Sequence, residues 1–404
     1  MINSGDTAWV LISAALVILM TPAVGFFYGG MVRKKNILST TMMCFAVLII
    51  MSLQWFIIGF TLAFAPTVRG LIGRLDWLGL IGVGELPNTA YAATIPFLAF
   101  MIFQGAFAII APALIVGAFV ERIRFSTFLF FSLIWATLVY DPIAHWVWAL
   151  GGWMRVLGVL DFAGGLVVHI SAGFSALAIA LIIGKRIGYG KDNMEPSNIP
   201  LVLLGAVLLW FGWFGFNGGS ALAANGLATS AFVVTNASAA AAAAVWMILS
   251  WMQRRPSVLG VATGAIVGLA AITPASGYVS PLFAMFIGAV ASLIAYYVIW
   301  LRMKLRIDES LDVFACHGMG SFWGVVAVGL FASKTVNAAG ADGLLFGNAH
   351  QFWIQLFAAC FVAFFSFTVT YIIARVIDGL VGLRVKETEE LVGLDISQHA
   401  ESAS

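Results

Sequence analysis

The chain has 404 residues, of which 62% are hydrophobic and only 9% charged, and its mean hydropathy is +1.03. Because this small number of charges cannot cover the surface of a soluble domain, the composition predicts a polytopic membrane protein. The net charge of +2 gives no sign of a nucleic-acid partner, because the basic residues lie in loops. Cys44, Cys316 and Cys360 lie in apolar runs without metal or redox spacing, so no disulfide framework is expected.

Eleven apolar runs are long enough to cross a bilayer. They cover roughly residues 8–31, 38–64, 91–119, 125–140, 162–184, 198–217, 226–251, 257–274, 279–301, 313–332 and 350–377. No basic residue precedes Arg33, so the start lacks the basic region of a secretory signal. We therefore expect the first run to be retained as a helix.

An odd number of spans places the two termini on opposite sides of the membrane, and the basic residues decide which is which. With the N-terminus outside, 16 of the 20 Lys and Arg residues, Arg254 and Arg255 among them, fall in inner loops and the tail. Four fall outside, namely Arg69, Arg74, Arg155 and Lys334. We predict a multi-pass protein of the cell membrane with its N-terminus outside and its C-terminus in the cytoplasm.

A weak internal echo suggests how the spans are grouped. Phe27-Tyr28-Gly29-Gly30 ends the first run and Phe216-Asn217-Gly218-Gly219 ends the sixth. Repeats of five spans insert in opposite orientations, as in many transporters. The predicted fold is therefore all-α, with a transmembrane domain over 1–377, repeat halves at about 1–184 and 198–332, and a long final helix at about 350–377. The polar tail 378–404 could dock on the inner face, bind a cytosolic partner or remain solvated.

Two histidines lie inside predicted spans, His169 in the fifth and His317 in the tenth. Gly165 and Gly173 share the helix face of His169, which predicts open space around the imidazole. A buried histidine is often a satisfied core residue, but ionisable residues within spans usually serve function. Equivalent positions in an inverted repeat could meet near the midplane. We predict that the two histidines share a hydrogen bond and titrate as a coupled pair.

The other histidines, and metal binding, are weaker candidates. His145 is expected in an outer loop with a capping or hydrogen-bonding role, while His350 and His399 have no predicted function. Cys316 and His317 would project about 100° apart on a helix, and no HxxxH or CxxC pair exists, so no metal site is predicted.

Two acids and several aromatic rings lie near the predicted membrane boundaries. Asp161 and Asp312 are expected to cap helix N-termini, although a charge at the outer mouth would also attract a cation. Interfacial belts explain most outer aromatic rings. Phe103 and Phe107 are one turn apart and could face one lumen. Rings hold small cations by about 0.5–2 kcal/mol, and the Ser220 hydroxyl could accept a hydrogen bond from the ion.

Several motifs together resemble the ammonium transporter family (Amt/MEP/Rh), and the resemblance covers nearly the whole chain. They are Phe27-Tyr28-Gly29-Gly30-Met31-Val32-Arg33, Glu121-Arg122-Ile123-Arg124-Phe125, Asp161-Phe162-Ala163-Gly164-Gly165 through His169, Trp213-Phe214-Gly215-Phe216-Asn217-Gly218-Gly219-Ser220, Asp312-Val313-Phe314 through His317-Gly318, and Gly393-Leu394-Asp395-Ile396-Ser397-Gln398-His399. The resemblance implies eleven spans, a homotrimer in membrane lipid, one pore per subunit, and an inner face that a PII-type signalling protein can block. It implies ammonium or ammonia as substrate, with methylammonium as analogue, and neither enzyme activity nor a cofactor.

The resemblance also implies roles for individual residues, and it favours the Amt branch. The implied recruitment site is Trp148, Phe107 and Ser220 with Ala163; the gate is Phe107 and Phe216 with Phe103; the pore lining is His169 and His317; and Asp161 and Asp312 are structural or electrostatic residues. Relatives commonly have glycine where this chain has Ala149, which affects the expected shape of the outer vestibule.

Physics limits the mechanism. A bare ion entering a medium of ε ≈ 4 costs of order 20 kcal/mol, so ammonium is expected to lose its proton near the gate and cross as ammonia. Potassium has no proton to lose. The sequence leaves open whether the proton also crosses. The alternative function is an ammonium sensor that signals through its tail; an enzyme is disfavoured because no nucleophile, metal site or cofactor loop is found.

Overall fold

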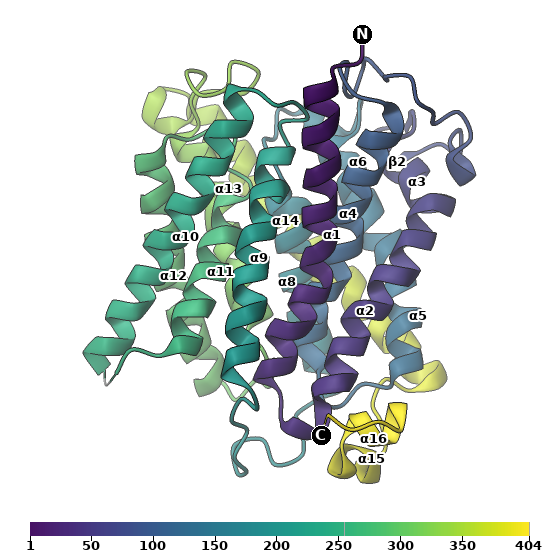
Figure 1. Cartoon of the computed structure of the whole chain (residues 1–404), viewed down its shortest axis with the longest axis vertical. Helices are drawn as coiled ribbons and strands as arrows, with labels where there is room; N and C mark the ends of the chain where they lie inside the picture. Colours follow the sequence, from purple (N-terminus) through teal and green to yellow (C-terminus); the bar gives the residue numbers. More distant parts are fainter. Residues whose placement is uncertain (254, 404) are drawn as a thin grey trace.

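The computed structural model describes residues 1–253 and 255–403, so Arg254 and Ser404, which the sequence placed in an inner loop and at the end of the tail, lie outside the described residues. Long helices run side by side between two ends of the molecule, with the N-terminus at one end and the C-terminus at the other (Figure 1). The predicted all-α, polytopic membrane fold is confirmed.

The elements up to the first histidine helix are α1 Ser4–Met31, η1 Lys34–Asn36, α2 Ile37–Gln54, η2 Trp55–Gly59, α3 Phe60–Phe64, β1 Thr67–Val68, β2 Ile72–Gly73, η3 Leu78–Leu80, α4 Phe97–Phe119, α5 Phe125–Trp135, η4 Ala136–Tyr140, α6 Asp141–Trp148, α7 Trp153–Val156, η5 Gly165–Ile170 and α8 Ser171–Ile183. The strands β1 and β2 form one small antiparallel pair in the loop after α3. The remaining elements are α9 Ile199–Gly219, α10 Gly226–Gln253, α11 Val258–Ile272, α12 Pro281–Lys304, η6 Phe314–Met319, α13 Gly320–Phe331, η7 Leu344–Phe346, α14 Ala349–Val381, α15 Glu387–Val392 and α16 Leu394–His399.

Each of the eleven predicted runs corresponds to a helical segment. In the described chain, ten segments are long and apolar enough to span a bilayer, and the eleventh, α11, is a shorter apolar helix of 15 residues. Some predicted boundaries were wrong. Helix α4 begins at Phe97, after Pro96, and not near residue 91. The run expected to end at 140 continues as helix through α6 to Trp148, and the short α7 follows after a non-helical turn.

Helices α1 and α9, which open the two predicted halves, pack closely in opposite directions. Glycines on α9 make this approach possible: a Cβ on Gly205 would lie 2.4 Å from the Phe27 nitrogen, and one on Gly212 2.3 Å from Met20 Cγ. Because hydrocarbon tails are as apolar as leucine, small residues that let backbones approach are a main source of helix association in a bilayer.

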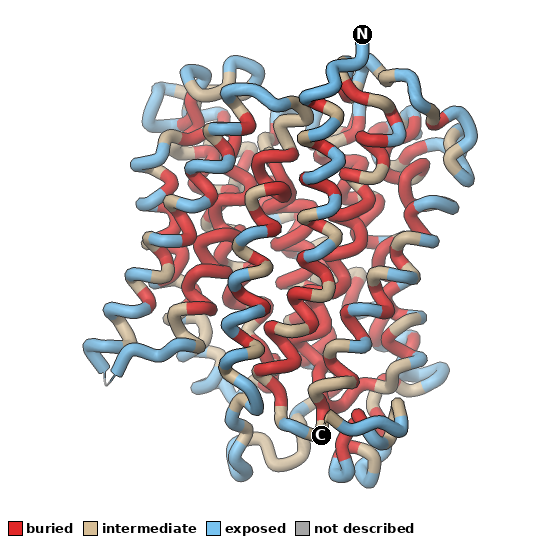
Figure 2. Tube along the Cα trace, viewed as in Figure 1, coloured by how far each residue is buried: buried red, intermediate tan, exposed pale blue. Residues whose placement is uncertain are grey.

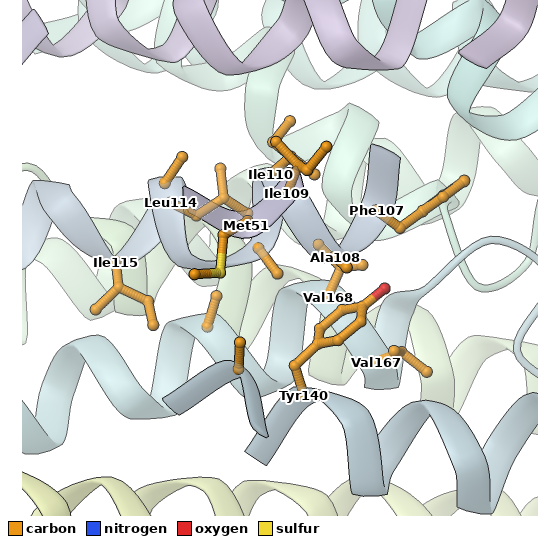
Figure 3. Packing of buried hydrophobic residues seen from close by; sticks show 14 of the residues in the cluster. Met51, Phe107, Ala108, Ile109, Ile110, Leu114, Ile115, Tyr140, Val167 and Val168 are labelled. Carbon is orange, nitrogen blue, oxygen red and sulfur yellow. The ribbon is translucent and has the colours of Figure 1, made fainter. Parts of the chain in front are cut away.

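Burial follows the pattern of a membrane protein. Buried backbone runs through the middle of the bundle, while exposed segments lie on its outside (Figure 2). Large apolar side chains face outward along the spans, among them Phe211, Trp353 and Phe364, the last with 71% exposure. The interior is packed with aliphatic and aromatic groups such as Ile109 and Val168 (Figure 3). An apolar exterior around an apolar interior fits a lipid solvent.

The tail lies against the same end of the molecule as the start of α2 (Figure 1). The Asp395 carboxylate accepts hydrogen bonds from Leu38 N at 3.1 Å and Ser39 N at 2.7 Å, so it caps α2. Asn36 Oδ1 in turn accepts from Leu394 N at 2.8 Å. The tail is therefore docked on its own chain and is not a freely solvated terminus.

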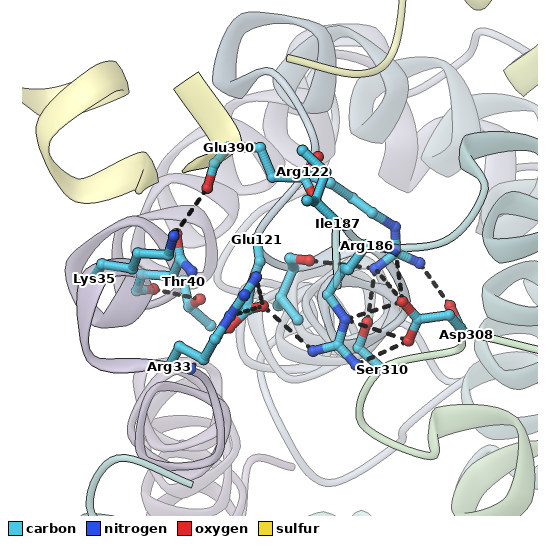
Figure 4. A network of polar contacts seen from close by, with 12 residues as sticks. Arg33, Lys35, Thr40, Glu121, Arg122, Arg186, Ile187, Asp308, Ser310 and Glu390 are labelled. Atoms are coloured by element: carbon cyan, nitrogen blue, oxygen red, sulfur yellow. Dashed lines mark hydrogen bonds and ion pairs between the residues drawn. The ribbon is translucent and has the colours of Figure 1, made fainter. Parts of the chain in front are cut away.

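Buried ion pairs join the loops at this end (Figure 4). Glu121 is 2.7 Å from Arg33 and 3.4 Å from Arg186, and Arg186 also pairs with Asp308 at 2.8 Å. Burial alone would raise the pKa of Glu121, but Arg186 and Arg33 outweigh it and hold that pKa below its usual range. The network fixes the ends of several spans relative to one another.

Candidate functional site

A cavity of about 160 Å³ opens at the N-terminal end of the bundle. Its lining includes Phe107, Trp148 and Ser220, three of the residues singled out from the sequence for substrate recruitment. The fourth, Ala163, is fully buried and is absent from this lining. The chain thus brings together side chains from α4, α6 and the end of α9.

Trp148 is held in place at both ends. Its indole N–H donates to the Asp161 backbone oxygen at 3.0 Å, and its own backbone oxygen accepts a hydrogen bond from Arg155. The Ser220 hydroxyl donates to the Phe216 backbone oxygen at 2.9 Å, which leaves its oxygen lone pairs available to accept. The cavity therefore offers a fixed indole face beside a hydrogen-bond acceptor.

Aromatic rings close the bottom of the cavity. The rings of Phe107 and Phe216 are 4.4 Å apart and tilted by 58°. Phe103 packs edge-on against Phe107, with ring centroids 5.0 Å apart. The Phe216 ring also stacks on the His169 ring at 5.7 Å. The aromatic barrier is thus in direct contact with the first histidine.

His169 and His317 meet, as predicted. Their Nδ1 atoms are 3.2 Å apart and their rings lie nearly parallel, with an interplanar angle of 21°. Trp213 also stacks on His169, with ring centroids 5.4 Å apart. Both histidines line a second, inner cavity of only about 10 Å³, whose other walls are mainly apolar. So small a space holds one water at most.

Each histidine lies in a π-helical segment, His169 in η5 and His317 in η6. Such wide turns are rare and often occur at functional sites. The expected open space around His169 was wrong. A Cβ on Gly173 would lie 2.2 Å from Gly318 N, and one on Gly165 2.5 Å from Pro274 Cβ. The glycines instead allow other backbone and ring atoms to approach, which is how the two histidine segments come into contact.

Asp161 caps the first histidine segment, as expected. Its carboxylate accepts hydrogen bonds from the N–H groups of four successive residues, Gly164 to Val167, at 2.7–3.3 Å. These bonds orient the segment that carries His169.

The corresponding acid in the second half is Glu309 and not Asp312, which corrects the expected capping role of Asp312. Glu309 precedes His317 by eight residues, as Asp161 precedes His169, and it accepts from Val313 N at 3.0 Å. Asp312 pairs with Arg302 at 2.8 Å instead. Burial, together with the Asp312 carboxylate, raises the pKa of Glu309 well above its usual range. The equal spacing from each histidine was the signal that could have identified Glu309.

His145 was expected in an outer loop, and that placement was wrong. It is fully buried in α6, with Nδ1 3.0 Å from the Ala63 oxygen and Nε2 2.7 Å from Thr67 Oγ1. Its hydrogen-bonding role is confirmed, and it ties α6 to the end of α3. Tyr28 was missed: it lines the inner cavity, and its hydroxyl donates to the Leu114 oxygen at 3.0 Å.

Two cavities separated by packed aromatic rings lie inside a bundle of spanning helices, an arrangement that fits a polytopic membrane transporter. The chain belongs to the Ammonium Transporter Family, whose sequence profile matches residues 8–404.

Full-length relatives agree with this assignment. The chain is 50% identical over 402 residues to "Ammonium transporter Amt1" of Archaeoglobus fulgidus, covering 99% of both chains. It is 48% identical to "Ammonium transporter" of Bacillus subtilis, covering 99% of this chain and 98% of the relative. Among solved structures, Candida albicans Mep2 superimposes with a TM-score of 0.90 at 37% identity, over 96% of this chain and 88% of that one. A "Sensor Amt Protein" does so with a TM-score of 0.90 at 31% identity, over 98% of each chain.

Proposed function

We propose that this protein transports ammonium across the cell membrane by recruiting the ion at the outer cavity and conducting ammonia past the two histidines. The observation that carries the proposal is the stacking of Phe216 on His169, because Phe216 also contacts Phe107, which lines the outer cavity with Trp148 and Ser220. Family membership and relatives named as ammonium transporters support the substrate.

Recruitment rests on two weak attractions that act together. The Trp148 and Phe107 rings, 5.9 Å apart, offer aromatic faces to a cation, and Ser220 offers a hydroxyl oxygen to one of its N–H groups. A cation held against aromatic rings gains about 0.5–2 kcal/mol. Ala163, which does not line the cavity, is given no role in this proposal.

Below the phenylalanine gate the path is apolar and nearly closed, so an ion would lose its hydration without compensation. We infer that ammonium gives up a proton at or below Phe107 and Phe216, either back to the outer solution or to the histidine pair, and that ammonia continues. Ammonia can exchange hydrogen bonds with the imidazoles that line the inner cavity. Potassium has no proton to release and makes no directional hydrogen bond, so the same barrier rejects it.

The experiment is reconstitution into liposomes, with radiolabelled methylammonium uptake and electrical current recorded on the same preparation. Saturable uptake that Ser220→Ala weakens would support the recruitment site. Absence of uptake above empty vesicles would overturn the transport proposal. Charge moved in proportion to uptake would show that the proton crosses too, while uptake without current would show net ammonia transport.

The arrangement in the membrane is also proposed. The membrane domain covers 1–377 and the tail 378–404, with the N-terminus outside, as the distribution of basic residues indicates. The subunits form a homotrimer in lipid, and a PII-type signalling protein binds the inner face. A pull-down before and after deletion of residues 379–404 tests whether the tail contributes to that binding, and equal recovery would exclude it.

The second candidate is a sensor, favoured by the docked tail and by the likeness to a protein named as a sensor. Under this alternative, ammonium binding at the outer cavity would release the tail. Hydrogen exchange of residues 387–399 with and without methylammonium separates the two, since a pure transporter would show no change.

A further inference from the structure

The outer cavity carries one formal charge, and its sign is positive. Arg155 belongs to the lining. The other described lining residues are uncharged at neutral pH; they are Phe64, Tyr91, Phe100, Gln104, Phe107, Trp148, Phe162, Ser220 and Leu222. A fixed cation at the entrance of a cation-recruiting cavity opposes binding.

The guanidinium is fixed in position. It donates to the backbone oxygen of Trp148, the residue whose indole lines the same cavity. Arg155 belongs to α7, and that short helix is tied to the β1–β2 loop by a bond from Trp153 N to the Gly70 oxygen at 3.2 Å. Among the described residues, no carboxylate lies within ion-pair distance of Arg155. Its charge is therefore not neutralised by a partner.

Asp161 and Asp6 do not belong to the cavity lining. The Asp161 carboxylate is engaged by four backbone N–H groups, and Asp6 Oδ1 accepts from Ala224 N at 2.8 Å. Both carboxylates are mostly buried, whereas Arg155 is exposed and belongs to the cavity lining. Of these three charges, that of Arg155 is the one that the cavity itself presents to an ion.

We propose that Arg155 is a specificity-determining residue that holds down the affinity of the outer cavity for cations and makes that affinity depend on ionic strength. The inference rests on the proposed recruitment site. Repulsion from one fixed charge acts in proportion to the charge of the approaching ion, so divalent cations are excluded more strongly than ammonium. Recruitment of a monovalent ion then depends on the contacts that Trp148 and Ser220 provide. The affinity of the cavity entrance for other cations stays low.

The test compares Arg155→Gln and Arg155→Lys with the wild type in vesicles of neutral phosphatidylcholine, so that salt cannot act through lipid charge. The KM for methylammonium uptake is measured at about 10 mM and about 150 mM ionic strength, where the screening lengths are about 30 Å and about 8 Å. Lys334→Gln, which removes an exposed cation outside the cavity lining, controls for general surface charge. Ser220→Ala in the same vesicles tests the recruitment site itself.

For the wild type, KM is expected to fall about two- to threefold as salt rises, because screening weakens the repulsion. Arg155→Gln is expected to have a KM about two- to fivefold lower at low salt and no salt response, with Arg155→Lys and Lys334→Gln behaving like the wild type. Competition by a divalent cation should appear only in Arg155→Gln.

Two results would overturn the role of Arg155. One is an Arg155→Gln variant with wild-type KM and salt response. The other is a KM raised in both Arg155 variants, which would show that the side chain only positions Trp148. If Ser220→Ala and Trp148→Leu also leave KM unchanged, the recruitment site itself fails, and this inference fails with it.

Discussion

The Nδ1 atoms of His169 and His317 face each other at 3.2 Å although 148 residues separate them in the chain. Two facing ring nitrogens can share one proton, so one imidazole donates from Nδ1 and the other carries its proton on Nε2. Two protonated rings would place two N–H groups against each other. The pair therefore holds at most one extra proton, and its titration belongs to the pair and not to either ring.

The first prediction concerns this pair. His169→Ala or His317→Ala removes one partner of a buried hydrogen bond, worth about 1 kcal/mol, so methylammonium flux is expected to change about fivefold or more. The removed ring also widens the inner cavity, so discrimination against potassium should weaken. Uptake and potassium-driven current in liposomes measure both effects.

Chromatography of the purified variants provides the control, since each should elute at the wild-type assembly size. Wild-type flux together with wild-type selectivity in both variants would remove the histidines from the transport path.

The second prediction concerns Asp161. Asparagine keeps one accepting oxygen and replaces the other with a donor, so about two of the four buried N–H groups lose their partner. Each unsatisfied group costs about 1–3 kcal/mol, so Asp161→Asn should lower the free energy of unfolding by about 2–6 kcal/mol. Thermal unfolding in detergent checks this. Asp76→Asn, which alters an exposed acid paired only with Arg74, should leave the melting temperature unchanged. A melting temperature equal to that of the wild type would show that the cap is dispensable.

Much of this arrangement could be predicted from the sequence. A bilayer requires about 20 apolar residues per span and internal backbone hydrogen bonds, which is why apolar runs located the helices well. The meeting of His169 and His317 was expected from their equivalent places in the two predicted inverted halves, and their Nδ1 atoms do face each other. The family motifs placed Phe107, Trp148 and Ser220 in one site, and they do line one cavity.

Other features of the site could not be predicted from the regular 3.6-residue spacing of an α-helix. The π-helical turns around both histidines depend on how η5 and η6 pack, so sequence spacing misjudged which groups lie near His169. Gly173 was expected to leave open space beside His169. A glycine inside a span equally allows the backbone of another helix to approach, and the backbone of Gly318 occupies that space. Glu309 was overlooked because Asp312 is closer to the histidine and belongs to a recognisable motif.

The third prediction follows from Glu121. Its pKa is lowered in the folded state, so its ionised form stabilises the fold above the unfolded pKa of about 4.5, and this stabilisation is lost as the pH falls through the lower, folded value. Glu121→Gln should therefore reduce stability at neutral pH and flatten the loss of stability below about pH 4.5. Melting temperatures between pH 3 and 7 measure both. Glu387→Gln, an exposed acid, should keep the wild-type profile, and an unchanged profile in Glu121→Gln would contradict the assigned cause.

The fourth prediction concerns Asp395, which joins the tail to α2. Both of its carboxylate oxygens accept backbone N–H groups, and loss of such a cap costs about 0.5–2 kcal/mol. Asp395→Ala should loosen residues 387–399 while the spans remain folded, because the tail contributes few of the contacts that hold the bundle. Hydrogen exchange of the tail amides should rise about two- to thirtyfold, the factor that corresponds to this loss, and cleavage by trypsin after Arg384 or Lys386 should become faster.

Glu401→Gln serves as the matched control, since this exposed acid follows α16 and makes no side-chain bond among the described residues. If the tail amides of Asp395→Ala exchange at the wild-type rate, the Asp395 cap does not hold the tail, and its other contacts, such as those of Asn36, Glu390 and Gln398, account for its docking.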